Sequence, residues 1–178
     1  MVHPIVLMPH AQPFNFIDKW AHPIWRKIGV YLWSIEHRDG YLASYVGQTS
    51  SRGGFDQRIW QEYKHWESGG DRPVDCGLYV RGLRRELAVR PADYPMGEII
   101  ALKGCIRLWL MPLFSAEECV QAERWLVSQL CRGDVTRQFL ANVAPDSYGP
   151  DTSWPVRIDA PPEFRVFGLT LPAPDPGP

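Results

Sequence analysis

One segment constrains what this chain folds into more than any other: residues 29–58, with the sequence GVYLWSIEHRDGYLASYVGQTSSRGGFDQR. Its first part lies in a near-continuous apolar run, 28–35, which has the length and composition of a buried β-strand. The dipeptide Asp39-Gly40 then suits a tight hairpin turn because its backbone tolerates positive φ angles, and a second strand-like run follows at 41–48. The segment therefore predicts two adjacent antiparallel strands.

Each predicted strand carries a tyrosine close to a glycine, Tyr31 in GVY and Tyr45 in YVG. Downstream, apolar residues recur at the three- and four-residue spacing of an amphipathic helix: Phe55, Ile59, Tyr63 and Trp66. At about 100° per residue, Arg58, Glu62 and His65 share a neighbouring polar stripe of this helix. We therefore expect a polar helix face containing Arg58 to lie over the strands that carry the two tyrosines.

A second helix is predicted late in the chain and carries a carboxylate on its apolar side. Ser115 and Glu118 form a capping box, which predicts that a helix begins there. Its apolar stripe consists of Val120, Leu126, Val127 and Leu130. Glu123 falls in the middle of that stripe, where a carboxylate is costly unless it is paired or bound to a metal. Glu123 is thus a candidate metal ligand, or a glutamate at the stripe edge whose head reaches water or an arginine.

The order GVY, YVGQT and Arg58, on a hairpin followed by a helix, resembles the GIY-YIG nuclease superfamily. Members of this superfamily also have a metal-binding glutamate in a later helix and often an asparagine after it. Glu123 in AERWLVSQL and Asn142 in FLAN stand in the corresponding places, so the resemblance covers roughly residues 28–145. It implies a compact domain that cleaves DNA phosphodiester bonds with one divalent metal ion.

The resemblance also implies a role for each of four residues. Glu123 would hold one Mg²⁺ or Mn²⁺ ion that polarises the scissile phosphate, and Arg58 would neutralise charge on a nonbridging oxygen. Tyr31 would activate or orient the attacking water, and Tyr45 would position water or phosphate. Because a free phenol has a pKa of about 10, a basic Tyr31 needs a depressed pKa or another group that takes its proton. We expect these four side chains to converge on one phosphate-sized pocket.

Further residues are predicted around this centre. Many superfamily members place a histidine or tyrosine four residues after the arginine, where this chain has Glu62. Either Glu62 or His65, which lies on the same helix face, could replace that auxiliary catalytic residue, and His65 is the candidate. Substrate contacts are predicted from six residues: Gly47, Gln48, Thr49, Arg52, Lys64 and Asn142. The alternative for Gly47 is a glycine that only relieves crowding between strands.

The predicted fold class is α/β (α+β), with a small three-stranded mixed or antiparallel sheet flanked by helices. Beyond the hairpin, strand-like runs stand at 99–102 and 106–113. Residues 28–145 would form the GIY-YIG-like domain with an insertion at about 68–97, preceded by an aromatic, proline-containing arm at 1–27. Residues 146–178 form a proline-rich extension that would wrap the domain or meet a partner.

The charge distribution bears on the partner. A net charge of −1 argues against a dominant, nonspecific DNA-binding surface. Through residue 110, however, the chain has 14 Lys and Arg against 11 Asp and Glu, a net charge of +3, and the remainder has 5 against 9, a net charge of −4. We therefore expect nucleic acid to meet the first part of the chain.

Cysteine spacing and hydropathy suggest a cellular setting. The four cysteines form no metal-binding spacing, so no zinc site is expected. No secretory signal is evident and the initial apolar run is too short for a membrane span, which predicts a cytoplasmic protein with reduced thiols and no membrane partner.

Two functions from different classes remain open at this point. The first is a divalent-metal-dependent DNA endonuclease that leaves a 5′-phosphate and a 3′-hydroxyl, in repair, restriction or a mobile element. The alternative is a catalytically silent module that binds nucleic acid or a protein, including a second copy of the chain. A covalent tyrosine nucleophile for strand transfer ranks last, because the expected paired histidines are absent.

Overall fold

The computed structural model describes residues 2–4, 6–7, 23–37, 40–67, 106–137, 139–142 and 157–171. Its centre is an antiparallel sheet with three long strands: β3 (Gly29–His37), β4 (Gly40–Thr49) and β5 (Ile106–Pro112). The two-residue strand β2 (Val6–Leu7) extends the sheet, giving the order β2-β5-β3-β4. The predicted α+β class with a small antiparallel sheet is therefore confirmed.

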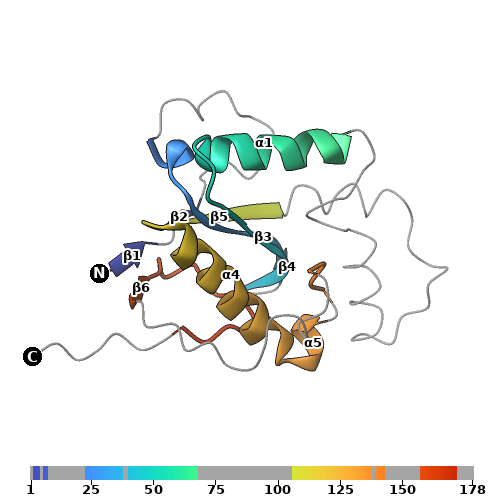
Figure 1. Ribbon diagram of the computed structural model, residues 1–178. Helices are drawn as coiled ribbons and strands as arrows, with labels where there is room; N and C mark the ends of the chain where they lie inside the picture. The colour runs from blue at the N-terminus through green and yellow to red at the C-terminus, as the bar shows by residue number, and fades with distance from the viewer. Residues whose placement is uncertain are drawn as a thin grey trace, which may run out of the picture.

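Two long helices cover opposite faces of this sheet (Figure 1). Helix α1 (Gly54–Glu67) packs on the face that contains Tyr31 and Trp33, and helix α4 (Ala116–Cys131) packs on the face that contains Val30 and Leu32. This separation follows from the alternation of side chains along β3, because every residue of this central strand is buried from Gly29 to Ile35. Two short helices complete the described fold, η2 (Pro23–Arg26) and α5 (Asp134–Arg137).

The β3–β4 register places the two tyrosines on one face. Tyr31 lies opposite Gly47, and Trp33 lies opposite Tyr45. The register shifts between Trp33 and Ser34, which leaves one residue of β4 without a direct partner. Tyr45 lies on the side of the sheet covered by α1 because it is opposite Trp33, and the bulge shifts the alternation of β4 so that Leu42, three residues from Tyr45, lies on that side too.

The predicted hairpin is confirmed by the pairing of its two strands. Strands β3 and β4 pair antiparallel as far as His37 and Gly40, so Gly40 belongs to β4, and the two residues between them lie outside the described part of the chain. A Cβ atom on Gly40 would lie 2.6 Å from the carbonyl oxygen of Arg165. Gly40 is therefore required by the close approach of the C-terminal segment.

Both extensions contribute described elements to the domain. Strand β1 (Val2–Pro4) pairs in parallel with β6 (Arg157–Asp159), and the two lie side by side in Figure 1. Tyr41 on β4 accepts a backbone hydrogen bond from Phe167 and donates one to Arg165. The expectation that the C-terminal extension wraps the domain is confirmed for residues 160–171, most of whose apolar side chains pack against the core on the α4 side, whereas Phe167 packs on the α1 side.

The capping box of α4 is also confirmed. Ser115 Oγ accepts from the Glu118 backbone N–H at 3.1 Å, and the Glu118 carboxylate accepts from the Ser115 N–H at 3.1 Å. The predicted strand at 99–102 and the insertion at 68–97 lie outside the described residues. No helix in the described part of the chain is both long enough and apolar enough to cross a membrane.

The N-terminal arm provides a first test of the packing. Trp25 is 6% exposed and belongs to the core on the α1 side, as predicted for a packed arm, whereas Trp20 is outside the described residues. Trp25→Ala is expected to lower the free energy of unfolding by about 3–5 kcal/mol, because it removes a buried aromatic ring. Denaturant titration followed by circular dichroism measures this loss.

Phe114→Ala is the matched control, because the Phe114 side chain is 65% exposed. Its expected effect is within about 0.5 kcal/mol. Equal stability changes for the two variants would contradict a packed arm.

Candidate functional site

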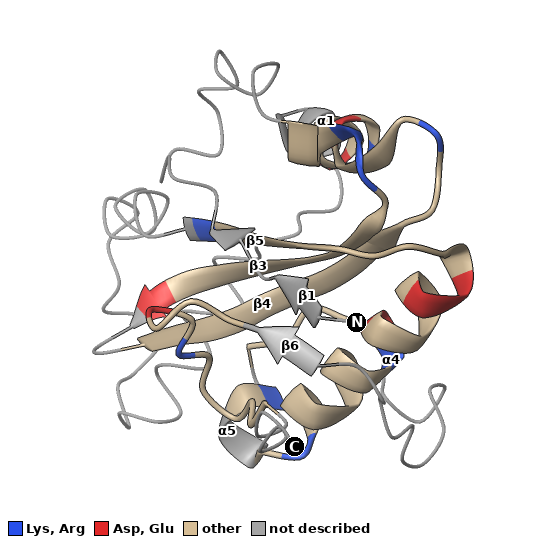
Figure 2. Cartoon of the chain, turned by 90° about the vertical axis from the view of Figure 1, so that its left-hand side faces the viewer, with Lys and Arg blue, Asp and Glu red and all other residues tan. Residues whose placement is uncertain are grey.

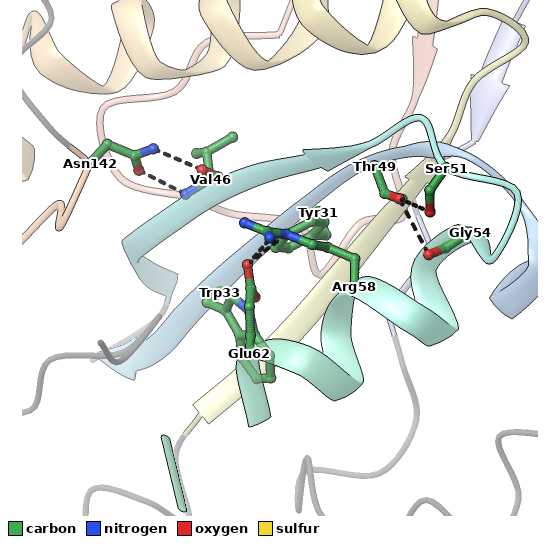
Figure 3. Close-up of polar contacts among 9 residues, drawn as sticks. All are labelled: Tyr31, Trp33, Val46, Thr49, Ser51, Gly54, Arg58, Glu62 and Asn142. Carbon is green, nitrogen blue, oxygen red and sulfur yellow. Dashed lines mark hydrogen bonds and ion pairs between the residues drawn. The ribbon is translucent and has the colours of Figure 1, made fainter. Parts of the chain in front are cut away.

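A buried carboxylate lies at the centre of the candidate site (Figure 3). Glu62, on α1, is 9% exposed and accepts a hydrogen bond from the phenol of Tyr31. Its second carboxylate oxygen accepts from the indole Nε1 of Trp33 at 3.1 Å. Tyr31 and Trp33 point to the same face of β3 because they are two residues apart, so one glutamate reaches both. Both oxygens of this buried carboxylate are thus satisfied.

Arg58 joins this cluster from one turn earlier on α1. Its Nε donates to Tyr31 Oη at 3.1 Å and lies 3.4 Å from Glu62 Oε1. The spacing of four residues on a helix brings Arg58 and Glu62 to one face. The Arg58 side chain is nevertheless 43% exposed, so its inner edge contacts buried groups while part of the side chain meets solvent.

Gly47 makes room for this arrangement. A Cβ atom at Gly47 would lie 2.2 Å from Tyr31 Oη and 2.4 Å from Tyr31 Cζ. The Tyr31 ring therefore lies across the Gly47 backbone, and its centroid is 6.3 Å from that of Tyr45. The glycine of YVG has a steric role beside the tyrosine of GVY, which agrees with the alternative stated from the sequence.

Neither tyrosine has the depressed pKa that a base would need. Burial raises the pKa of Tyr31, and the negative charge of Glu62 and the hydrogen bond to it raise it further, against the opposing charge of Arg58. Burial also raises the pKa of Tyr45, where hydrogen bonding to Arg58 and its charge act in the opposite direction. Both phenols therefore keep their protons at neutral pH, and Tyr31 donates its own to Glu62.

The charges of Glu62 and Arg58 each affect the pKa of the other group. Burial raises the pKa of Glu62, whereas the hydrogen bonds from Tyr31 and Trp33 and the charge of Arg58 favour its carboxylate form. Burial favours loss of the Arg58 proton, but interactions with Tyr31 and Glu62 outweigh it and raise the pKa of Arg58. Arg58 is therefore a permanent positive charge at the edge of a buried polar cluster.

Glu123 approaches this cluster from the other helix. It is half-buried on α4, which covers the face of the sheet opposite Tyr31. Burial raises the pKa of Glu123, while the charge of Arg58 lowers it and that of Glu62 raises it. Among the described residues no hydrogen bond joins Glu123 to Tyr31, Tyr45 or Arg58. The structure thus brings Tyr31, Tyr45 and Arg58 into contact. Glu123 is close enough for the charge of Arg58 to affect its pKa.

The residues around Glu123 fit a divalent ion that takes one carboxylate ligand from the protein and its other ligands from water or substrate. The described residues contain no group of three or more His, Cys, Asp or Glu side chains that could enclose a metal. One half-buried carboxylate suits Mg²⁺, which often keeps several waters and takes other ligands from substrate phosphates. Glu123 is therefore the residue that would hold such an ion, without a protein cage around it.

Asn142 has a structural partner in this fold. Its amide accepts from the Val46 N–H at 2.8 Å and donates to the Val46 carbonyl at 2.7 Å, so it occupies the free edge of β4 as a neighbouring strand would. Ala141 donates to the Ser44 carbonyl at 2.6 Å just beside it. The predicted substrate contact by Asn142 has no support in this geometry, and the residue lies beside the tyrosine cluster.

The other predicted substrate contacts lie in different places. Gln48 pairs with Val30 and so belongs to the α4 face, away from Tyr31, and its Oε1 is buried without a hydrogen-bond partner among the described residues. Thr49 donates to the Gly54 carbonyl at 3.3 Å and shapes the loop before α1. Arg52 is exposed in that loop. The side chains of Lys64 and His65 are outside the described part of the structure.

Sequence reasoning missed two residues of this site, Glu62 and Trp33. Glu62 was predicted on the polar face of the helix and as one of two possible replacements for the auxiliary residue, but its hydrogen bonds to Tyr31 and Trp33 were not predicted. A recognisable signal was the four-residue spacing from Arg58, which predicts an ion pair on a helix. No local signal identified Trp33, whose partner is 29 residues away.

Comparison of the chain with protein-family models, curated proteins and solved structures finds no match.

The close contact at Gly47 generates a stability prediction. Gly47→Ala forces the new methyl group against the Tyr31 ring, and overpacking of this kind costs about 1–3 kcal/mol. Denaturant titration should show this loss, and Ser50→Ala, at an exposed position, should behave like the wild type. Unchanged stability of Gly47→Ala would mean that Tyr31 does not lie across this strand.

The raised pKa of Glu123 predicts a pH dependence. The native state binds more protons than the unfolded chain between the ordinary and the raised pKa of this group, so its contribution to stability falls as pH rises through that interval. In metal-free buffer, the stability of Glu123→Gln relative to wild type should therefore increase between about pH 4 and pH 7. Glu117→Gln, at an exposed position of α4, controls for the loss of charge. A difference for Glu123→Gln that decreases with pH would contradict the raised pKa.

Proposed function

We propose that this protein is a divalent-metal-dependent endonuclease that hydrolyses DNA phosphodiester bonds to 5′-phosphate and 3′-hydroxyl ends. The observation that carries the proposal is the contact of Tyr31, Tyr45 and Arg58 at one end of the tyrosine-bearing face, in the order that the GIY-YIG resemblance implies. The order of elements supports it, because a β3–β4 hairpin leads into α1, and β5 returns beside β3.

The charges of the site suit a phosphodiester. Arg58 provides a permanent positive charge at a partly exposed position, and its terminal N–H groups match the oxygens of a phosphate. Glu123 would hold Mg²⁺ or Mn²⁺, which supplies Lewis-acid polarisation of the phosphate when bound. Arg58 would stabilise charge on a nonbridging oxygen.

The two tyrosines would have different tasks. Tyr45 is partly exposed and its raised pKa keeps its proton in place, so it would donate a hydrogen bond to the phosphate or to the attacking water. Tyr31 is 1% exposed and donates its proton to Glu62, so it would hold Arg58 in place by accepting a hydrogen bond from the Arg58 Nε–H. Water deprotonation by the Tyr31 phenol is not part of the proposal.

The distribution of charge favours an approach of the nucleic acid from the side of α1. Arg26, Lys27 and Arg52 are exposed near the start of α1, where the Phe55 N–H donates to the Lys27 carbonyl at 3.0 Å. Figure 2 shows basic segments beside α1 and an acidic first turn of α4. A phosphate backbone would lie along the basic side, and the negative charges at the start of α4 would repel it from that end of the molecule.

A silent binding module is the second candidate, and one observation favours it. Tyr31 and Glu62 satisfy each other's hydrogen bonds within the fold, as a purely structural cluster would. Exposed aromatic side chains at Trp60 and Phe114 offer contact area for a protein partner or a second copy of the chain. A folded wild type that binds nucleic acid but cleaves none would favour this candidate.

The decisive assay compares wild type, Glu123→Gln and Arg58→Ala on duplex, branched and single-stranded DNA, and on RNA, with Mg²⁺ or Mn²⁺. Glu123→Gln should lose cleavage but keep metal-free DNA binding, because it removes only the charge that captures the ion. Arg58→Ala should lose both phosphate affinity and about 10²-fold or more in cleavage rate.

Arg132→Ala is the matched control, since Arg132 is an exposed arginine at the end of α4. It should retain wild-type cleavage. Equal cleavage by wild type and Glu123→Gln would show that Glu123 is not the metal ligand, and absence of cleavage by folded wild type on every substrate would refute the nuclease proposal.

A further inference from the structure

The Arg58 guanidinium is held by its Nε edge. Its Nε carries a single N–H, which points inward to Tyr31 Oη at 3.1 Å with Glu62 Oε1 at 3.4 Å. A guanidinium has five N–H donors in a rigid plane, and the other four are on its two terminal nitrogens. Fixing the Nε edge therefore sets the direction in which the terminal nitrogens project (Figure 3).

Glu62 determines that Tyr31 Oη is the acceptor, and not the donor, in its hydrogen bond with Arg58. Tyr31 Oη accepts from Arg58 while its own proton goes to Glu62, and Trp33 donates to the other carboxylate oxygen. The result is a hydrogen-bond chain in which the Trp33 indole N–H, the Tyr31 hydroxyl and the Arg58 Nε–H each have an acceptor. Only a carboxylate can accept from both Tyr31 and Trp33 with separate oxygens, because a glutamine offers one oxygen and one NH₂ group.

Burial makes this chain a rigid support. Tyr31 and Trp33 are each 1% exposed on the central strand β3, and Gly47 leaves no space between the Tyr31 ring and β4. Side chains held this way lose little further freedom when a ligand binds, which is the condition for preorganised stabilisation of charge. A lysine at position 58 would have the charge but no Nε edge to be held.

We propose that Glu62 is a positioning residue, which together with Tyr31 holds Arg58 by its Nε edge and directs the terminal guanidinium nitrogens at the substrate phosphate. This inference rests on the proposed function for its substrate, and it goes further by assigning the orientation of Arg58 to a residue that does not touch substrate. The two tyrosines then have different roles. Tyr31 helps to hold Arg58, and Tyr45 faces the substrate.

The first test uses steady-state cleavage by Glu62→Gln. The variant should lower kcat by about 10²-fold, as expected for a misdirected group, with little change in KM because the Arg58 charge remains. Metal-free binding of the same DNA should persist. Ile59→Val, a neighbouring core substitution on α1, should keep wild-type kcat and so shows what a loss of packing alone does. Wild-type kcat in Glu62→Gln would overturn the proposal.

Arg58→Lys gives a second test that does not depend on altering a buried residue. If orientation matters, it should lose about as much kcat as Arg58→Ala, although it retains the positive charge. Retention of wild-type kcat by Arg58→Lys would show that charge alone suffices and would overturn the proposal.

A spectroscopic readout separates failure of this inference from failure of the proposed function. In ¹H–¹⁵N spectra the Arg58 Nε–H resonance, assigned by its disappearance in Arg58→Lys, should exchange slowly with water in the wild type. It should exchange rapidly in Glu62→Gln. Equal protection in both would overturn the role of Glu62 even if the protein cleaves DNA, whereas loss of protection supports it even if no substrate is cleaved.

Discussion

The buried carboxylate of Glu62 is the interaction on which the tyrosine-bearing face depends. A carboxylate removed from water requires donors for its oxygens, and Tyr31 and Trp33 supply them from the central strand. Those bonds join α1 to β3, beside the core contacts of the buried α1 side chains Phe55 and Ile59. Arg58 follows, because it is one helical turn away and finds the Tyr31 oxygen free to accept. One buried carboxylate thus joins the helix to the sheet and orients a surface charge.

The edge strand β4 connects the two sides of the molecule. Helices α1 and α4 lie on opposite faces, yet the charges of Arg58 and Glu62 act on Glu123. Such coupling is possible beside an edge strand, where no further strand separates groups on the two faces. The amide of Asn142 closes part of this edge by bonding the Val46 backbone. A phosphate near Arg58 would therefore lie within the influence of groups from both faces.

Local sequence patterns predicted the long strands and the long helices of the described fold. The apolar runs gave β3, β4 and β5 to within a few residues, and the capping box located the start of α4. Gly40 was assigned to the turn because glycine favours positive φ, but its reason is the close approach of Arg165. That contact joins residues more than a hundred positions apart, and no local pattern records it.

The sequence by itself determined which residues share a face along β3 and along each long helix, because the periods of strand and helix fix that from local spacing. In β4 the bulge interrupts the period, so that Leu42 and Tyr45 share one face although they are three residues apart. The sequence placed Tyr31 and Tyr45 on neighbouring strands and turned Arg58 toward them, as the structure shows. Only the tertiary structure decided which donors meet Glu62, that Tyr31 lies against Gly47, and that Glu123 comes from the opposite side of the sheet. These depend on the distance and rotation between elements, which packing of the whole core sets and periodicity does not contain.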